Sequence, residues 1–313
     1  MKKILLATTV LVGTAGFAAA EVTLSGDGRM GVVSNDGAVS FSSRARVKFT
    51  LAGTTDNGLE FGGSFRANNA NTDGYSCSDD DGDGTMDDSE CAAFSGGADD
   101  GTAGSVFIKG GFGTLTMGDI DSAANNAVGQ IAGVGYTGLG TLNEIAYVGS
   151  GDDEGLLYEY SASGFTGYLS VGQPSNGDDT ASVGVKYATD GFTVGLGMDA
   201  SAAGDQYAGS VSTTVAGVSL TALASQTEYG DDVTGNAIGM SASYTMGATT
   251  FTAYSLGSSI AQDSTGVGAS YDLGGGAALS AGLVHTNIAR PEPTRRGTQT
   301  DDILADVGVS FSF

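Results

Sequence analysis

The amino-acid sequence predicts an all-β fold: a transmembrane 16-stranded antiparallel up-and-down β-barrel. Three observations lead to this prediction. Short segments of alternating apolar and polar residues recur along the chain, the connections between them alternate in length, and no later apolar run is long enough to cross a membrane as a helix. The composition agrees, since 53 glycines, three prolines and no tryptophan do not suit a helical protein.

The N-terminus has the layout of a cleaved secretory signal peptide, residues 1–20. Lys2 and Lys3 precede a mostly apolar run, and three alanines end at Ala20, just before the expected cleavage point. The run falls short of the roughly 18–20 residues that a membrane anchor needs. Residues 21–313 are expected to form a single barrel domain. The chain has 36 acidic and 12 basic residues, two of the latter in the leader, so this domain carries a net charge of −26.

Acidic residues and glycine can be equally abundant in disordered proteins and in calcium-binding repeat proteins. The periodicity of apolar residues therefore has to distinguish a barrel from these classes. The expected strands are near ten residues long, the length that a tilted strand needs to cross hydrocarbon. In 307–313 (VGVSFSF), for example, successive side chains point to opposite faces, one apolar and one polar or small. A soluble β-sandwich would show the same alternation. The sixteen segments are 22–33, 39–52, 59–69, 103–110, 113–119, 155–161, 165–172, 180–188, 191–199, 206–214, 217–226, 236–246, 248–256, 264–272, 276–285 and 302–313.

The connections favour the barrel over the sandwich. They are alternately short and long along most of the chain, and the two longest are 70–102 and 120–154. An even-numbered up-and-down barrel requires tight turns at the periplasmic rim and long loops outside, whereas a Greek-key sandwich does not. Pro174, Pro291 and Pro293 all fall in long connections, where no ladder hydrogen bond is lost. The first and last strands are expected to pair, because a closed barrel has no edges.

Five segments carry a resemblance to a known family: 21–31 (EVTLSGDGRMG), 41–46 (FSSRAR), 54–62 (TTDNGLEFG), 268–276 (GASYDLGGG) and 305–313 (ADVGVSFSF). They resemble the general diffusion porins of alpha-proteobacteria. The resemblance implies a channel in the outer membrane of a Gram-negative bacterium, for passive diffusion of ions and small hydrophilic solutes. It also implies a homotrimer and a long third loop folded into the lumen as a constriction. The expected partners are outer-membrane lipid, lipopolysaccharide and small polar solutes in transit, and not nucleic acid. The resemblance covers essentially the whole chain after the leader.

Half of the positive charge after the leader lies on the first three expected strands. In the second strand the apolar side chains alternate with Arg44, Arg46 and Lys48, which therefore face the lumen. The same alternation turns Arg29 and Arg66 inward from the first and third strands. Isolated charged residues that face a water-filled lumen need no function, because any polar side chain is tolerated there. Clustering at nearly one height predicts a basic wall that tunes which solutes pass.

The opposing negative side is expected from the connection 120–154 and its ends, since a loop of this length is uncommon unless functional. Opposite charges across a narrow lumen order water and disfavour apolar solutes. The net charge of −26 favours cations and the basic wall favours anions, so the sequence leaves the selectivity open. The expected acidic residues are Asp119, Asp121, Glu144, Asp152, Asp153 and Glu154.

Residues 79–90 (DDDGDGTMDDSE) match the calcium-loop pattern D-x-D-x-D-G-x5-E position for position. The flanking helices of a calcium sensor are missing, so the prediction is structural Ca2+ in an external loop, with a solvated acidic loop as the alternative. Cys77 and Cys91 bracket the motif, and an oxidising compartment favours a disulfide between them. The expected calcium ligands are Asp79, Asp81, Asp83, Thr85 through its carbonyl, Asp87 and Glu90.

Catalysis has little support in the sequence, and the protein is not expected to be an enzyme. His285 is the only histidine, so no second histidine can assist it, and we expect it at the rim or in the lumen. Two alternatives to general diffusion stay open: a substrate-specific channel, and a structural or adhesive calcium-binding surface barrel. Arg290, Arg295 and Arg296 in the last long connection are candidates for contacts with lipopolysaccharide phosphates.

Overall fold

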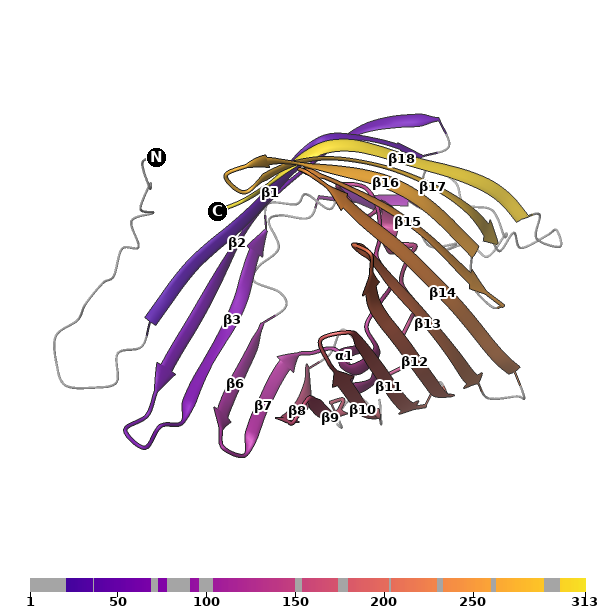
Figure 1. The fold of residues 1–313 in the computed structure, drawn as a ribbon. Helices are drawn as coiled ribbons and strands as arrows, with labels where there is room; N and C mark the ends of the chain where they lie inside the picture. Colours follow the sequence, from indigo (N-terminus) through magenta and orange to yellow (C-terminus); the bar gives the residue numbers. More distant parts are fainter. Residues whose placement is uncertain are drawn as a thin grey trace.

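Sixteen strands form a closed antiparallel barrel in the computed structural model (Figure 1). Each barrel strand pairs with its neighbour in the chain, and β1 pairs with β18, so the predicted fold class and strand number are confirmed. Within the part of the chain that the structure describes, no helix combines the length and apolar character needed to span a membrane. The structure describes residues 21–35, 37–68, 73–77, 91–95, 104–149, 154–173, 180–202, 204–229, 233–259, 263–289 and 299–313.

The barrel strands differ widely in length. They are β1 (Glu21–Asn35), β2 (Ala38–Thr54), β3 (Glu60–Asn68), β6 (Ser105–Gly110), β7 (Gly113–Asp119), β8 (Glu154–Ala162), β9 (Phe165–Val171), β10 (Ala181–Ala188), β11 (Phe192–Ser201), β12 (Gly204–Val215), β13 (Val218–Tyr229), β14 (Val233–Met246), β15 (Thr249–Ser258), β16 (Asp263–Gly274), β17 (Ala277–Ala289) and β18 (Gln299–Ser312). The barrel wall is therefore lowest at β6, with six residues, and at β7 and β9, with seven each, and it is high at β2, with 17.

The two ends of the chain close the barrel. Asp27 lies opposite Ser312, and the pairing continues without a break to Asn35 opposite Leu304. The terminal residue takes part as well, since the Phe313 amide donates to the Gly26 carbonyl at 2.8 Å. Closure satisfies the backbone groups of the first and last strands, which would otherwise be exposed edges in hydrocarbon.

Alternation along the strands makes the outer surface apolar. Phe41, Ile238 and Leu24 expose 93%, 65% and 63% of their side chains on that surface. Their immediate neighbours point to the lumen, as the period of two in a strand requires. Tight turns join the strands at one rim: Ala216 and Gly217 between β12 and β13 both have positive φ, at 52° and 81°, as a two-residue type I′ hairpin needs.

One departure from expectation lies between β3 and β6. The connection 70–102 was expected to be loop throughout, but it contains a two-stranded sheet of β4 (Asp73–Cys77) and β5 (Cys91–Ser95). Five residues are too few for an alternation signal, and these strands pair only with each other, in a sheet separate from the barrel sheet. Cys77 lies opposite Cys91 in this pairing. The predicted calcium ligands, Arg290, Arg295, Arg296 and residues 1–20 lie outside the described residues.

Candidate functional site

The connection between β7 and β8 folds into the barrel, as expected for a constriction loop, and supplies most of the buried core. We use the name constriction loop for residues 120–149. It contains the short helix α1 (Ala123–Val128) and the 3-10 turn η1 (Leu139–Thr141). Figure 1 shows α1 inside the ring of strands, and α1 contacts β9, β10, β11 and β12. The buried apolar loop residues that pack against wall residues such as Tyr254 and Val284 include Ile131, Val134, Leu139, Leu142, Ile145 and Tyr147.

Glycines on the inner wall make room for this loop. A Cβ atom on Gly195 would lie 2.1 Å from the Ala127 carbonyl oxygen, and one on Gly184 would lie 2.2 Å from that of Ala123. Both contacts are to backbone, so neither could be relieved by a side-chain rotation. Inward-facing glycine at these positions therefore allows the helix to lie directly on the strands. We call the inward glycines beneath the loop the glycine seat; they are Gly31, Gly184, Gly195, Gly197, Gly268, Gly282 and Gly308.

Serine hydroxyls on the wall bind the first turn of α1. The amide of Ala123 donates to Ser170 Oγ and that of Ala124 donates to Ser182 Oγ, both at 2.8 Å. The amide of Asn125 donates to Ser122 Oγ at 3.1 Å. The first N–H groups of a helix have no partner within the helix, so the barrel supplies the acceptors that this helix lacks. The loop backbone is thus attached to the wall at its start.

Two buried carboxylates hold the ends and the middle of the loop. Asp199 on β11 is fully buried and accepts from Ser122 Oγ at 3.3 Å and from the Gly149 amide at 3.1 Å. Asp306 on β18 accepts from the amide of Thr137 at 2.8 Å and from its hydroxyl at 2.6 Å. Asp199 therefore joins the two ends of the loop, and Asp306 anchors its far side. Neither residue was expected to have a role from the sequence.

The five predicted basic-wall residues lie on the inner face of β1, β2 and β3. The strand pairing puts Arg29 opposite Arg44 and Lys48 opposite Arg66, so the basic residues form a band running diagonally across the three strands. Arg29 also reaches the constriction loop, where Nη1 donates to the Thr137 carbonyl at 3.2 Å. The basic residues therefore extend without interruption from the constriction loop, which Arg29 contacts, across β1 and β2 to β3.

One acidic residue within this band, Asp27, was not predicted from the sequence. Asp27 lies two residues before Arg29 on the same face, and its carboxylate pairs with Arg44 at 3.2 Å and with Arg46 at 2.9 Å. Charge-assisted hydrogen bonds of this kind fix the geometry of neighbouring guanidinium groups that would otherwise repel each other. The alternation that turns Arg29 inward turns Asp27 inward as well, so the sequence contained the signal.

The predicted acidic residues are only partly brought together. Asp121 and Glu144 are both exposed on the constriction loop and interact electrostatically. Asp121 also accepts from the Asn125 amide group at 3.0 Å. Asp119, at the end of β7, is exposed and lies opposite Glu154 in the strand pairing. Asp152 and Asp153, and the side chain of Glu154, lie outside the described residues.

Although Glu144 is exposed, the protein around its carboxyl removes part of its hydration and raises its pKa above the usual value, and repulsion from Asp121 raises the pKa further. A raised pKa means that, on acidification, Glu144 loses its negative charge at a higher pH than an ordinary glutamate does. On acidification, we expect the permeability to cations relative to that to anions to fall. The fall should begin at a higher pH than the one at which an ordinary glutamate becomes protonated. Reversal potentials measured across a pH series check this. In Asp121→Asn the fall should begin at lower pH, and an unchanged profile would contradict the assignment.

The remaining candidates do not form a catalytic or metal site in the described residues. There, no group of three or more His, Cys, Asp and Glu side chains could hold a metal ion. His285 lies on β17 opposite Ile303, near the rim of long connections, and it is exposed on the same face as Leu283. Of the two places expected for this residue, the rim is therefore the one observed.

Comparisons with known proteins agree with this architecture. Residues 7–289 match the Gram-negative porin family. The porin of Rhodobacter capsulatus is 33% identical over 340 aligned residues, which cover 94% of this chain and all of that protein. Among solved structures, a porin refined at 1.8 Å resolution is similar with a TM-score of 0.70 at 29% identity. A triple mutant of the Rhodopseudomonas blastica porin shares the fold, with a TM-score of 0.64 at 18% identity. Both alignments cover 94% of this chain and 100% of the other chain.

Members of this family are channels rather than enzymes, which agrees with the expectation of no catalytic function. A closed barrel with an apolar exterior, a loop docked inside and charged residues along the lumen is the arrangement of such a channel. The chain belongs to the Gram-negative porins and forms an outer-membrane channel for the diffusion of ions and small hydrophilic solutes.

Proposed function

We propose that the lumen selects solutes by size and by a transverse electric field between the basic wall and the acids of the constriction loop. The observation that carries this proposal is the position of the loop. Among the described residues, its side-chain hydrogen bonds to the barrel go to β9–β12, β14, β16, β18 and β1, and none goes to β2, β3, β6 or β7, so we place the passage along the inner face of those strands. Arg44, Arg46, Lys48 and Arg66 lie on that face.

The field acts on water and on solutes in the passage. Ordered water between opposite charges is costly to displace, so an apolar solute crosses less readily than a polar one of equal size. Single-channel recording of the purified protein in a salt gradient tests the proposal. We expect stable ohmic steps and a reversal potential that moves when wall or loop charges are neutralised. A reversal potential that ignores these substitutions would overturn it.

We also propose that the channel is a homotrimer that buries the low side of its wall. The resemblance to general diffusion porins and the uneven wall support this. A six-residue strand tilted by about 40° covers roughly 15 Å of membrane thickness, whereas the apolar band of an outer-membrane barrel is about 25 Å tall. A neighbouring copy against β6 and β7 would keep lipid from that gap. Light scattering in detergent tests this, and a monomeric mass would overturn it.

We further propose that Ca2+ occupies the acidic segment 79–90 and that Cys77 and Cys91 form a disulfide beneath it. The match to the calcium-loop pattern and the pairing of β4 with β5 support this. Opposite Cα atoms in an antiparallel pair lie about 4.5–5.5 Å apart, within the roughly 4.4–6.8 Å that a disulfide spans. Such a bond would close the segment and preorganise its ligands.

Calorimetric titration of the whole protein with calcium tests the site. We expect binding that is lost in Asp81→Ala with Glu90→Ala, because both substitutions remove ligand carboxylates. The matched control is Asp99→Ala with Asp100→Ala, which removes the same charge from the same connection outside the motif. Absence of binding, or equal losses in the two double variants, would show that the acids are merely solvated.

A further inference from the structure

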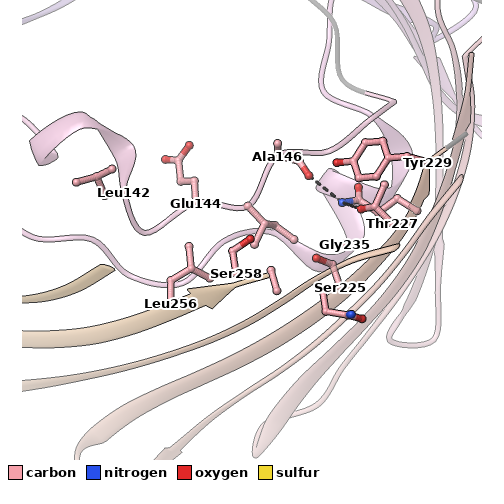
Figure 2. Close-up of a pocket in the computed structure, with 13 residues that line it drawn as sticks. Leu142, Glu144, Ala146, Ser225, Thr227, Tyr229, Gly235, Leu256 and Ser258 are labelled. Carbon is pink, nitrogen blue, oxygen red and sulfur yellow. Dashed lines mark hydrogen bonds between the residues drawn. The ribbon is translucent and has the colours of Figure 1, made fainter. Parts of the chain in front are cut away.

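A cavity of about 290 Å3 lies between the constriction loop and the inner wall of the barrel. Figure 2 shows Leu142, Glu144 and Ala146 of the loop on one side, with Leu256 and Ser258 of β15 on the other. The cavity lies toward the rim of long connections, since Tyr229 ends β13 and Ser258 ends β15 there. Its size is close to the lower limit of small-molecule sites, about 300 Å3, so any occupant has few heavy atoms.

The walls of the cavity are partly apolar and rigid. Leu142, Ile145 and Leu256 are buried and belong to the core between loop and barrel. Gln206 is fixed by three hydrogen bonds: Nε2 donates to the Ala146 carbonyl at 2.8 Å and to Thr227 Oγ1 at 3.0 Å, and Oε1 accepts from the Val148 amide at 3.3 Å. A site held in this way needs little reorganisation when a ligand enters, which favours binding.

Glu144 is the only charged residue among the thirteen that line the cavity. Its side chain is exposed, and the ion pairs identified among the described residues join other groups: Arg44 and Arg46 with Asp27, and Lys109 with Glu60. The remaining polar lining includes hydroxyl groups of Ser225, Thr227 and Tyr229. A carboxylate beside apolar walls attracts a cation with an apolar part and repels an anion.

We infer that this cavity binds a small organic ammonium ion, whose charged group pairs with Glu144 while its apolar part lies against Leu142 and Leu256. A hydrated metal cation cannot use the apolar walls, and a neutral solute cannot use the carboxylate. A bound amine obstructs the vestibule beside the constriction, so it reduces the ion current through the channel. This inference rests on the barrel being a conducting channel, and not on the proposed transverse field.

Bilayer recording with benzylamine, which is a cation at neutral pH, tests the inference. Added on the side of the long connections, it should reduce the current with a saturating concentration dependence. Benzyl alcohol and benzoate have similar apolar parts without the positive charge, and they should not. Methylammonium, which keeps the charge and lacks the ring, should act only at much higher concentration. Equal effects of benzylamine and methylammonium would mean that charge alone is sensed, and would overturn the inference.

Variants locate the effect. Glu144→Gln keeps the size of the side chain and should weaken the benzylamine block by about tenfold, the scale of one lost charge-assisted hydrogen bond. Asp121→Asn removes a loop charge outside the cavity lining and should retain most of the block. Ser225→Phe fills the cavity while leaving Glu144 in place and should abolish the block. An unchanged block in Glu144→Gln or in Ser225→Phe would overturn the site, and open-channel conductance without amine shows separately that each variant conducts.

Discussion

Arg44→Gln with Arg46→Gln is expected to move the channel strongly toward cations. The two substitutions reduce the wall from five basic residues to three and leave the carboxylate of Asp27 without its two ion-pair partners. A unit charge about 6 Å from an ion in water contributes about 0.7 kcal/mol. Removing two such charges therefore changes the energy of a permeating ion by about 1.4 kcal/mol, which is roughly tenfold in the permeability of each ion before screening by salt, upward for cations and downward for anions.

Reversal potentials in a potassium chloride gradient measure this change. The matched control is Asp27→Asn, which removes the negative member of the same cluster and should move the reversal potential toward anions. The shifts should also shrink as ionic strength rises, because the charges face water. Shifts of the same sign in the two variants, or none in either, would show that these side chains do not face the permeating ions.

Asp199→Ala is expected to release the constriction loop at both of its ends. The substitution removes two hydrogen bonds to this carboxylate, one from the buried Ser122 hydroxyl and one from the partly buried Gly149 amide. A hydrogen bond to a charged group contributes about 1.5–3 kcal/mol. A loss of at least about 2 kcal/mol for the pair raises the undocked population of the loop roughly 30-fold. The barrel itself should persist, because its strand pairing is unchanged.

Hydrogen exchange at the loop amides and current noise in single-channel records measure the release. Exchange at Ala123 and Gly149 should accelerate, and the open current should fluctuate between narrow and wide levels. Asp272→Ala is a suitable control, since its carboxylate accepts from the Gly274 amide at 2.8 Å in an exposed turn far along the chain from the loop. Slow exchange and a quiet current in Asp199→Ala would mean that wall serines and apolar packing hold the loop without this carboxylate.

The barrel could be predicted because its rules are local. A period of two distinguishes the exposed side chain of Phe41 from the inward side chain of Arg44, and it needs only the residues of one strand. Connection lengths then separate a barrel from a sandwich. The pair β4 and β5 escaped this reasoning because five residues carry too little periodicity, and their hydrogen bonds are made to each other.

The interior could be predicted only in part, because it depends on contacts between distant residues. The loop was expected in the lumen from a resemblance, but no local pattern specifies that Asp306 meets Thr137, 169 residues away, or that Gly184 lies under Ala123. Inward acids such as Asp199 look like ordinary lumen residues until the loop is placed beside them. Asp27 differs, since it lay on the same predicted face as Arg29 and could have been included.

The glycine seat has a consequence for the order of assembly. Its members come from β1, β10, β11, β16, β17 and β18, so the surface that receives the loop exists only after the first and last strands have met. Before that moment Ile131, Leu139 and the other apolar loop residues have no complete surface to cover them. Contacts across such long stretches of chain form late in folding, because closing them costs most chain entropy. We therefore expect a newly closed barrel to be wide at first and to narrow only when the constriction loop docks on its inner wall.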